Sequence, residues 1–306
     1  MSHSKLTQGA GSIKILTSGT PNGYKTSILA EELVTAYPGF KYDFEPISFK
    51  ENEQKQEWFL HVNPNGRIPA AIVYPKEAGG APHYLFESAS IMLWLVDHED
   101  TRHEFSFVDE YEKSEAMSWV FFMHGGLGPM QGYPMYALPP YLTPTKHTVL
   151  TLLRLSAPKA NHFFRYAPEK IPYAINRYRE ETKRLYSVLE DRLAGKRENP
   201  ATTDGGKTEG PERDYIVGSG KGKYSFVDIN IFPWVRMHKW AGVESLDEFP
   251  NLSKWLNRIA DRPAVKRGLD VPEKNSYNPD MSEKEQKQKA EDAKKWIHGG
   301  AAAEKK

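Results

Sequence analysis

Apolar and polar positions follow two different periods along the chain, and the first part mixes strand and helix patterns. Residues 12–17 alternate as in a strand, whereas Ile28, Leu29 and Leu33 recur on one face of an expected helix over residues 24–36. Turn formers and apolar runs predict the remaining elements of this part: strands at 41–49, 70–74 and 84–86, a short helix at 54–62, and a mostly buried helix after residue 88. The predicted order is therefore β-α-β-α-β-β-α.

From residue 110 onward the pattern changes to helical periods separated by Pro and Gly, with helices expected at 110–123, 172–194, 226–240 and 252–262. The change of period places a domain boundary near residues 100–108. We expect an α/β domain over residues 12–100 and an all-helical domain over residues 108–270.

Three segments depart from these regular patterns. Residues 133–160 form a segment rich in proline and aromatic residues, and residues 196–213 have hardly an apolar side chain, which predicts a mobile loop. Residues 271–306 are strongly charged. We expect this tail to be a frayed helix or disordered, outside the core.

The size and charge of the chain narrow the class of protein. A chain of 306 residues with 39% hydrophobic residues is long enough for two cores. Its net charge of +1 creates no global field that would attract nucleic acid or anionic lipid. No apolar run reaches the roughly 18 residues that span a bilayer, and the start is polar. We expect a cytoplasmic protein without nucleic-acid or membrane partners.

The absence of cysteine narrows the chemistry further. With no Cys, the chain has no structural disulfide, no thiolate metal site and no thiol nucleophile of its own. Any sulfur chemistry must therefore use a sulfur that a substrate supplies, and no metal is expected.

Short motifs in both domains carry a family resemblance. In the first domain these are Thr-Pro-Asn-Gly-Tyr-Lys at 20–25, Asn-Pro-Asn-Gly-Arg-Ile-Pro-Ala at 63–70, and Phe-Glu-Ser-Ala-Ser-Ile at 86–91. Residues 164–178 and 262–268 continue the series. In this order the motifs resemble the glutathione transferase superfamily, more narrowly the nu-class bacterial disulfide-bond oxidoreductases and the fungal Ure2p-like enzymes. The resemblance covers residues 13–130 and 161–270.

The resemblance implies a thioredoxin-like N-terminal domain that binds glutathione, an all-helical C-terminal domain and a homodimer. It places Thr20 and Asn22 opposite the glutathione thiol. Lowering the pKa of a thiol from about 8.5 by two units requires roughly 2.7 kcal/mol. One or two hydrogen bonds to the sulfur, at about 1.5–3 kcal/mol each, would suffice together with a helix start. Alternatively, Pro-Asn-Gly is simply a turn.

The other glutathione contacts follow from the same motifs. Glu87 and Ser88 would bind the γ-glutamyl ammonium and carboxylate at a helix start, unless they are a plain helix cap. Arg67 and Ile68 precede Pro69, which is cis in this superfamily and exposes the main chain of the preceding residue to the cysteinyl unit. Alternatively, Pro69 is a routine strand-edge proline. Gln54 falls at the glycyl end, or is an ordinary surface glutamine.

Four residues of the second domain complete the expectations. His124 and Arg177 match positions that contact glutathione, although His124 could be a packing histidine and Arg177 could pair with Glu180 or Glu181. Ser225 and Asp228 look like the superfamily's capping box, a stability feature. Segment 133–160 could line a pocket for an aromatic or lipophilic substrate, or form a lid or dimer contact.

The predicted function is that of a glutathione transferase. The enzyme would ionise the thiol of its co-substrate for conjugation to a small electrophile, as in detoxification, or for glutathione-dependent disulfide reduction. Two alternatives stay open: a ligand-binding or regulatory protein with little turnover, and a conjugating or isomerising enzyme of secondary metabolism.

Overall fold

The computed structural model describes residues 4–75, 80–132, 160–166, 170–198, 207–275, 277, 281–282 and 284–292. The chain forms two compact units, each made of separate stretches of sequence. The first comprises Met1–Val120, Leu189–Arg236 and Pro250–Ser276, and the second comprises Phe121–Val188, Met237–Phe249 and Tyr277–Lys306. These units cut across the chain order, so the domain boundary at residues 100–108 stays a prediction.

The first unit contains a four-stranded sheet in the order β2-β1-β3-β4. The strands are β1 (Ile13–Thr17), β2 (Tyr42–Pro46), β3 (Ala70–Val73) and β4 (His83–Phe86). β2 is parallel to β1, and β3 is antiparallel to both β1 and β4. The helices between and after them are α1 (Pro21–Ala36), η2 (Glu53–Lys55), α2 (Glu57–Val62) and α3 (Ser88–Glu99). The predicted β-α-β-α-β-β-α order and the thioredoxin-like fold are confirmed.

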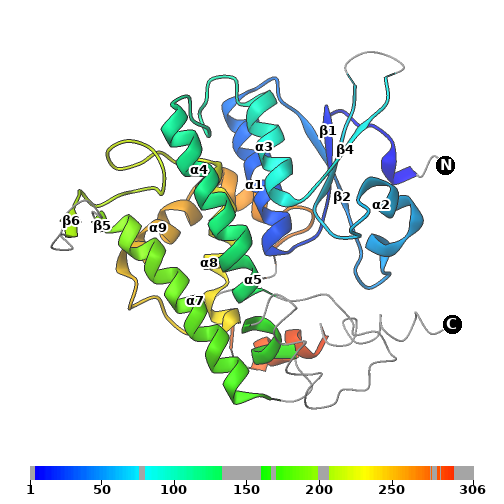
Figure 1. Ribbon diagram of the computed structural model, residues 1–306. Helices are drawn as coiled ribbons and strands as arrows, with labels where there is room; N and C mark the ends of the chain where they lie inside the picture. The colour runs from blue at the N-terminus through cyan, green and yellow to red at the C-terminus, as the bar shows by residue number, and fades with distance from the viewer. Residues whose placement is uncertain are drawn as a thin grey trace. The chain divides into compact units, whose positions relative to one another are not determined.

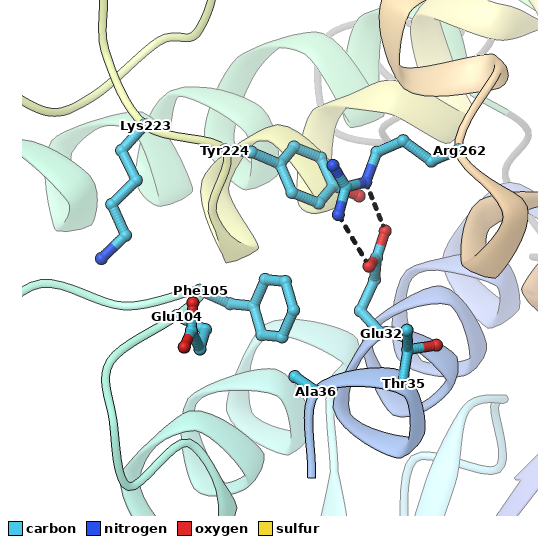
Figure 2. Close-up of a pocket in the computed structure, with 8 residues that line it drawn as sticks. All are labelled: Glu32, Thr35, Ala36, Glu104, Phe105, Lys223, Tyr224 and Arg262. Carbon is cyan, nitrogen blue, oxygen red and sulfur yellow. Dashed lines mark hydrogen bonds and ion pairs between the residues drawn. The ribbon is translucent and has the colours of Figure 1, made fainter.

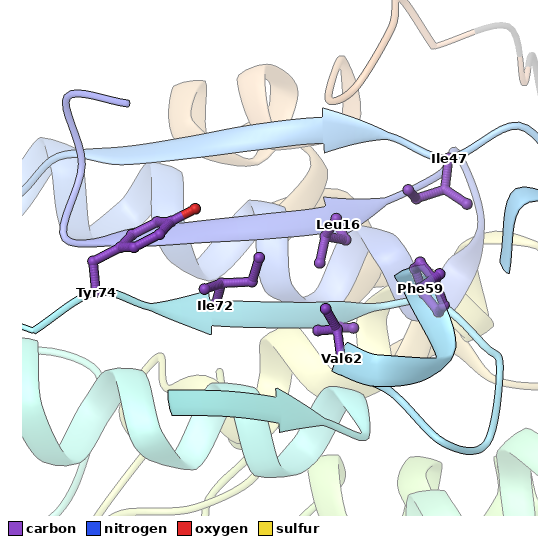
Figure 3. Packing of buried hydrophobic residues seen from close by; sticks show 7 residues of the cluster. Leu16, Ile47, Phe59, Val62, Ile72 and Tyr74 are labelled. Atoms are coloured by element: carbon purple, nitrogen blue, oxygen red, sulfur yellow. The ribbon is translucent and has the colours of Figure 1, made fainter. Parts of the chain in front are cut away.

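Helices cover both faces of this sheet, with α1 and α3 on one face and α2 on the other (Figure 1). On the α2 face, Phe59 and Val62 point toward Leu16 and Ile72 of the sheet (Figure 3). All four side chains are at most 1% exposed, and burying each one stabilises the fold by about 1.5–3 kcal/mol. β1 lies at the centre of the sheet between covered faces, which explains why all its residues are buried.

Helix α1 is the packing centre of the first unit, because α3, α8 (Phe226–Arg236) and α10 (Pro263–Leu269) all contact it. The contact with α10 is close at Gly268, where a Cβ atom would lie 2.5 Å from Cα of Ile28. Ser27 Oγ also donates a hydrogen bond of 2.7 Å to the Gly268 carbonyl. Helices α8 and α10, from the chain after residue 188, thus pack against α1.

The rest of the chain is mainly helical, as predicted. Helices α4 (Glu110–Phe122) and α7 (Pro172–Leu193) each run from one unit into the other, and α9 (Pro250–Ala260) belongs to the first. Among its described residues, the second unit also contains the short helices η3 (Met123–Leu127), α5 (Gly128–Gln131), η4 (His162–Tyr166) and η5 (His238–Ala241). The helix expected over residues 226–240 ends at Arg236.

Two segments differ from the sequence-based expectation. Within residues 196–213, β5 (Lys196–Glu198) pairs with β6 (Lys207–Glu209) in a two-stranded antiparallel sheet, so this stretch is not a plain loop. In the tail, residues 284–292 are helical, and Met281 and Ala290 are buried in a cluster with Trp240. This part of the tail therefore contributes two apolar side chains to a core cluster. Segment 133–160 lies outside the described residues except for Ala160.

Candidate functional site

The candidate site residues of the first unit come together because three strand ends meet at one edge of the sheet. In the strand register, Leu16 of β1 pairs with Ala70 of β3, and Ala70 pairs with Phe86 of β4. The chain leaves β1 after Thr17, enters β3 from Pro69 and leaves β4 at Glu87. The three motifs at 20–25, 63–70 and 86–91 therefore adjoin one another at this edge.

The first motif forms the start of α1. Thr20 is the N-cap, and its Oγ1 accepts a hydrogen bond of 3.2 Å from the Gly23 N–H. The Thr20 O–H can therefore still donate outward. Asn22, half-buried in the first turn, accepts a 3.2 Å hydrogen bond at Oδ1 from Nε1 of Trp234. Two polar side chains thus stand at a positively polarised helix start, which favours an anion.

The second motif presents main-chain groups. Asn63 Nδ2 donates to the Arg67 carbonyl at 2.6 Å and Asn63 Oδ1 accepts from the Asn65 N–H at 2.9 Å, which fixes the loop. The Ile68–Pro69 peptide bond is cis, as the resemblance implies. Neither the N–H nor the C=O of Ile68 has a hydrogen-bond partner in the described part of the chain. The Ile68 side chain packs against the sheet core, so it also anchors this backbone.

The third motif begins α3 with a strained residue. Glu87, the N-cap, has φ 69° and ψ 123°, a region that non-glycine residues rarely adopt and that costs about 1–3 kcal/mol. Its exposed carboxylate lies 3.4 Å from Nδ2 of Asn65, and Ser88 is buried just behind it. The arrangement combines an exposed negative charge with the free N–H groups of a helix start, which suits a zwitterion such as an α-amino acid.

Gln54 differs from a surface glutamine. It is 3% exposed in η2, and its Nε2 donates to Asn52 Oδ1 at 2.8 Å. Its Oε1 is buried with no hydrogen-bond partner among the described residues. A buried acceptor without a partner is uncommon in proteins. The backbone carbonyl of Gln54 lies close to Gly66, in the loop that precedes Ile68. This observation favours a ligand position over the surface alternative.

The sequence analysis assigned no role to two residues of this region, Lys25 and Trp234. Lys25 is fully buried in α1, and burial lowers the pKa of its ammonium group to about 7, while the Glu87 carboxylate acts in the opposite direction. Its burial could have been inferred from spacing, because Lys25 lies three and four positions before the buried Ile28 and Leu29 and so on the same face of the helix. Trp234 is 212 positions from Asn22, and no local pattern marks their contact.

His124 and Arg177 lie in the second unit. His124 is half-buried in η3, and Arg177 is exposed on α7. The alternative partners of Arg177 are engaged elsewhere, because Glu180 contacts Arg179 at 3.5 Å and Glu181 pairs with Arg184 at 2.7 Å. Within the described residues Arg177 forms no ion pair.

Ser225 and Asp228 form the reciprocal contacts of a helix cap at the start of α8. The Ser225 N–H donates to Asp228 Oδ2 at 3.0 Å, and the Val227 N–H donates to Ser225 Oγ at 3.3 Å. Asp228 Oδ1 accepts from the Ile216 N–H and from Trp255 Nε1. Burial nevertheless raises the pKa of this carboxyl to about 6.

A pocket elsewhere in the first unit offers no comparable site. It lies at the other end of α1, about 20 Å along the helix from Asn22, and Glu32 and Arg262 in it already form a bidentate ion pair (Figure 2). Across the described residues there is no cluster of His, Asp and Glu that would hold a metal ion. Nor does that part of the chain contain a helix long and apolar enough to cross a membrane.

Comparison with known proteins matches the same two regions. The family model described as the glutathione S-transferase N-terminal domain matches residues 22–97, and the one for the C-terminal domain matches residues 174–263. The disulfide-bond oxidoreductase YfcG of Escherichia coli (strain K12) is 31% identical over 257 residues, 84% of this chain and 94% of that protein. The transcriptional regulator URE2 of Saccharomyces cerevisiae is 29% identical over 81% of this chain and 65% of its own length.

Solved structures show the same relationship. A glutathione transferase homologue from Lodderomyces elongisporus, crystallised with two GSH per subunit, matches 85% of this chain and 98% of its own with a TM-score of 0.63 and 32% identity. The resemblance inferred from the sequence motifs is confirmed. The chain belongs to the glutathione S-transferase family.

Proposed function

We propose that this protein binds glutathione at the shared edge of β1, β3 and β4 and ionises its thiol beside Thr20 and Asn22. The observation that carries the proposal is the meeting of three complementary features at this edge. They are the donors at the start of α1, the main chain of Ile68, which has no hydrogen-bond partner among the described residues, and the carboxylate of Glu87 at the start of α3. Together they match the thiol, the cysteinyl backbone and the γ-glutamyl end of one tripeptide.

Each end of the tripeptide has a proposed partner. The γ-glutamyl carboxylate accepts from N–H groups at Ser88, and its ammonium pairs with Glu87. The cysteinyl unit pairs with Ile68 as an added strand would. The glycyl end lies toward Gln54 and Arg67, where the buried Gln54 Oε1 accepts a hydrogen bond from the glycyl N–H. The assignment of His124 and Arg177 as glutathione contacts stays a prediction from the sequence motifs.

The reaction we propose is thiol–disulfide exchange. The ionised sulfur of one glutathione attacks a disulfide, forming a new sulfur–sulfur bond as the other sulfur leaves as a thiolate and takes up a proton. A second glutathione then releases the first as glutathione disulfide, so two glutathiones reduce one disulfide to two thiols. The function named for YfcG and the two GSH bound by the L. elongisporus homologue support this reaction.

Conjugation to an electrophile is the second candidate, because the same thiolate would attack carbon and both family models are those of transferases. Hydroxyethyl disulfide and chloronitrobenzene serve as paired substrates that separate the two reactions. We expect faster turnover with the disulfide, and a large loss in Asn22→Ala.

Binding is tested separately from turnover. Titration calorimetry should detect glutathione and its disulfide, with weaker binding in Glu87→Gln. Arg179→Gln is a matched control, because its Glu180 contact lies on an exposed face of α7. A protein that takes up neither ligand would overturn the proposal.

We also propose that the protein is a cytoplasmic homodimer acting in detoxification of disulfides or electrophiles. Sedimentation analysis of the purified chain tests whether it is a dimer. A monomer would be the contrary result.

A further inference from the structure

The side chain of Asn22 is held by a partner that can only donate. Nε1 of Trp234 lies 3.2 Å from the Asn22 amide, and an indole nitrogen has a hydrogen to give but no lone pair to accept with. The atom of Asn22 that faces Trp234 must therefore be the oxygen. This contact fixes an orientation that the shape of an amide alone leaves open.

The consequence concerns the other end of the amide. With Oδ1 turned to Trp234, the NH₂ group of Asn22 points away from it, and Nδ2 donates to no acceptor among the described residues. A thiolate can only accept hydrogen bonds. An Asn22 with the opposite orientation would present its oxygen to the sulfur and repel the charge.

Trp234 is well placed to impose this orientation. It is 7% exposed in α8, a helix that packs directly on α1, so its ring has little room to move. Burial also means that water does not readily replace its N–H as the partner of Asn22. Thr20 needs no such help, because the Gly23 N–H already occupies its oxygen and leaves its O–H to donate.

We propose that Trp234 is a positioning residue, which turns the Asn22 amide so that its NH₂ group donates to the sulfur of bound glutathione. The inference rests on the proposed function. It adds a residue of α8 to the groups proposed to surround the thiol, which otherwise come from the start of α1.

The test compares Trp234→Phe, which keeps a buried ring and removes the N–H, with Trp255→Phe. Trp255 is the matched control: it is also buried and donates through Nε1, but to Asp228 at 2.8 Å. The pKa of bound glutathione is read from the ultraviolet absorbance of its thiolate, and affinity is read from calorimetry.

In Trp234→Phe we expect the thiol pKa to rise by about 0.5–1 unit, with roughly three- to tenfold less thiolate at pH below that pKa. Glutathione affinity should change little. Trp255→Phe should lower the melting temperature and leave the thiol pKa unchanged. In an Asn22→Ala background, Trp234→Phe should have no further effect on the pKa.

An unchanged thiol pKa in Trp234→Phe, or an equal rise with and without Asn22, would overturn the inference while leaving glutathione binding in place. Wild-type protein that binds no glutathione would instead overturn the proposed function. If Trp234→Phe does not fold, replacing the indole with benzothiophene, which has the same shape and no N–H, must raise the pKa as well.

Discussion

Glu87 combines a strained backbone, which affects the stability of the fold, with a carboxylate that we assign to glutathione binding. Substitutions at this residue can separate the two effects. At φ 69° and ψ 123°, the Cβ atom of Glu87 is the source of the strain, and glycine adopts positive φ without it. Glu87→Gly should therefore remove about 1–3 kcal/mol of strain, and the greater freedom of glycine in the unfolded chain offsets about 0.4–1 of this. We expect a net gain of about 1 kcal/mol, or roughly 2 °C in melting temperature.

The same change removes the carboxylate that we assign to the γ-glutamyl ammonium. A hydrogen bond to a charged group contributes about 1.5–3 kcal/mol, so glutathione should bind roughly 10- to 150-fold more weakly. The variant would be more stable and less active, as expected where strain is kept for function.

Glu87→Ala is the control, because it removes the same carboxylate but keeps Cβ. Thermal unfolding and calorimetry should show equal losses of affinity in both variants and a higher melting temperature for the glycine variant alone. A glycine variant no more stable than the alanine variant would refute the strain argument. Unchanged affinity in both would refute the assignment of the ammonium.

Three further predictions concern the frame around the site. The pKa of the Asp228 carboxyl is about 6 in the fold and about 3.9 in the unfolded chain. Its preference for the protonated form in the fold therefore adds about 3 kcal/mol to the free energy of unfolding below pH 4, and this stability is lost as pH rises through 6. The stability of Asp228→Asn relative to wild type, measured in urea, should improve by that amount between pH 4 and 7; a constant gap would be the contrary result. Gly268→Ala should destabilise the fold by several kcal/mol, because its Cβ would overlap the backbone of Ile28; a melting temperature equal to wild type would contradict the close approach. Arg262→Ala removes the partner of the Glu32 carboxylate, whose side chain is only 3% exposed. The free energy of unfolding should therefore fall by about 3–5 kcal/mol. A loss under about 1 kcal/mol, as for a surface ion pair, would contradict this prediction.

The first domain was predictable from sequence because its signals are local. Alternation in β1, the turn before α1 and the cap before α3 are each set by neighbouring residues, and the motif order supplied the fold. The position of Gln54 also followed from that order. Its burial did not, since a glutamine in a polar loop carries no local sign that its side chain turns inward.

Contacts between distant segments were beyond a single sequence. Trp234 belongs to an apolar helix whose pattern explains its burial but not its hydrogen bond to Asn22. The tail was expected outside the core because its composition is charged, yet Met281 and Ala290 are buried in a cluster with Trp240. Composition averages over a segment, whereas packing depends on a few positions.

The main-chain amide and carbonyl of Ile68, which have no partner in the part of the chain that the structure describes, bear on how this enzyme could have diverged. Every amino acid carries those same two groups, so docking the middle of a peptide ligand there places no demand on the identity of the residue. Selection would act instead on the proline that shapes the turn and on the loop behind it. Position 68 is then free to drift among residues that fill the sheet core, without altering which tripeptide is recognised.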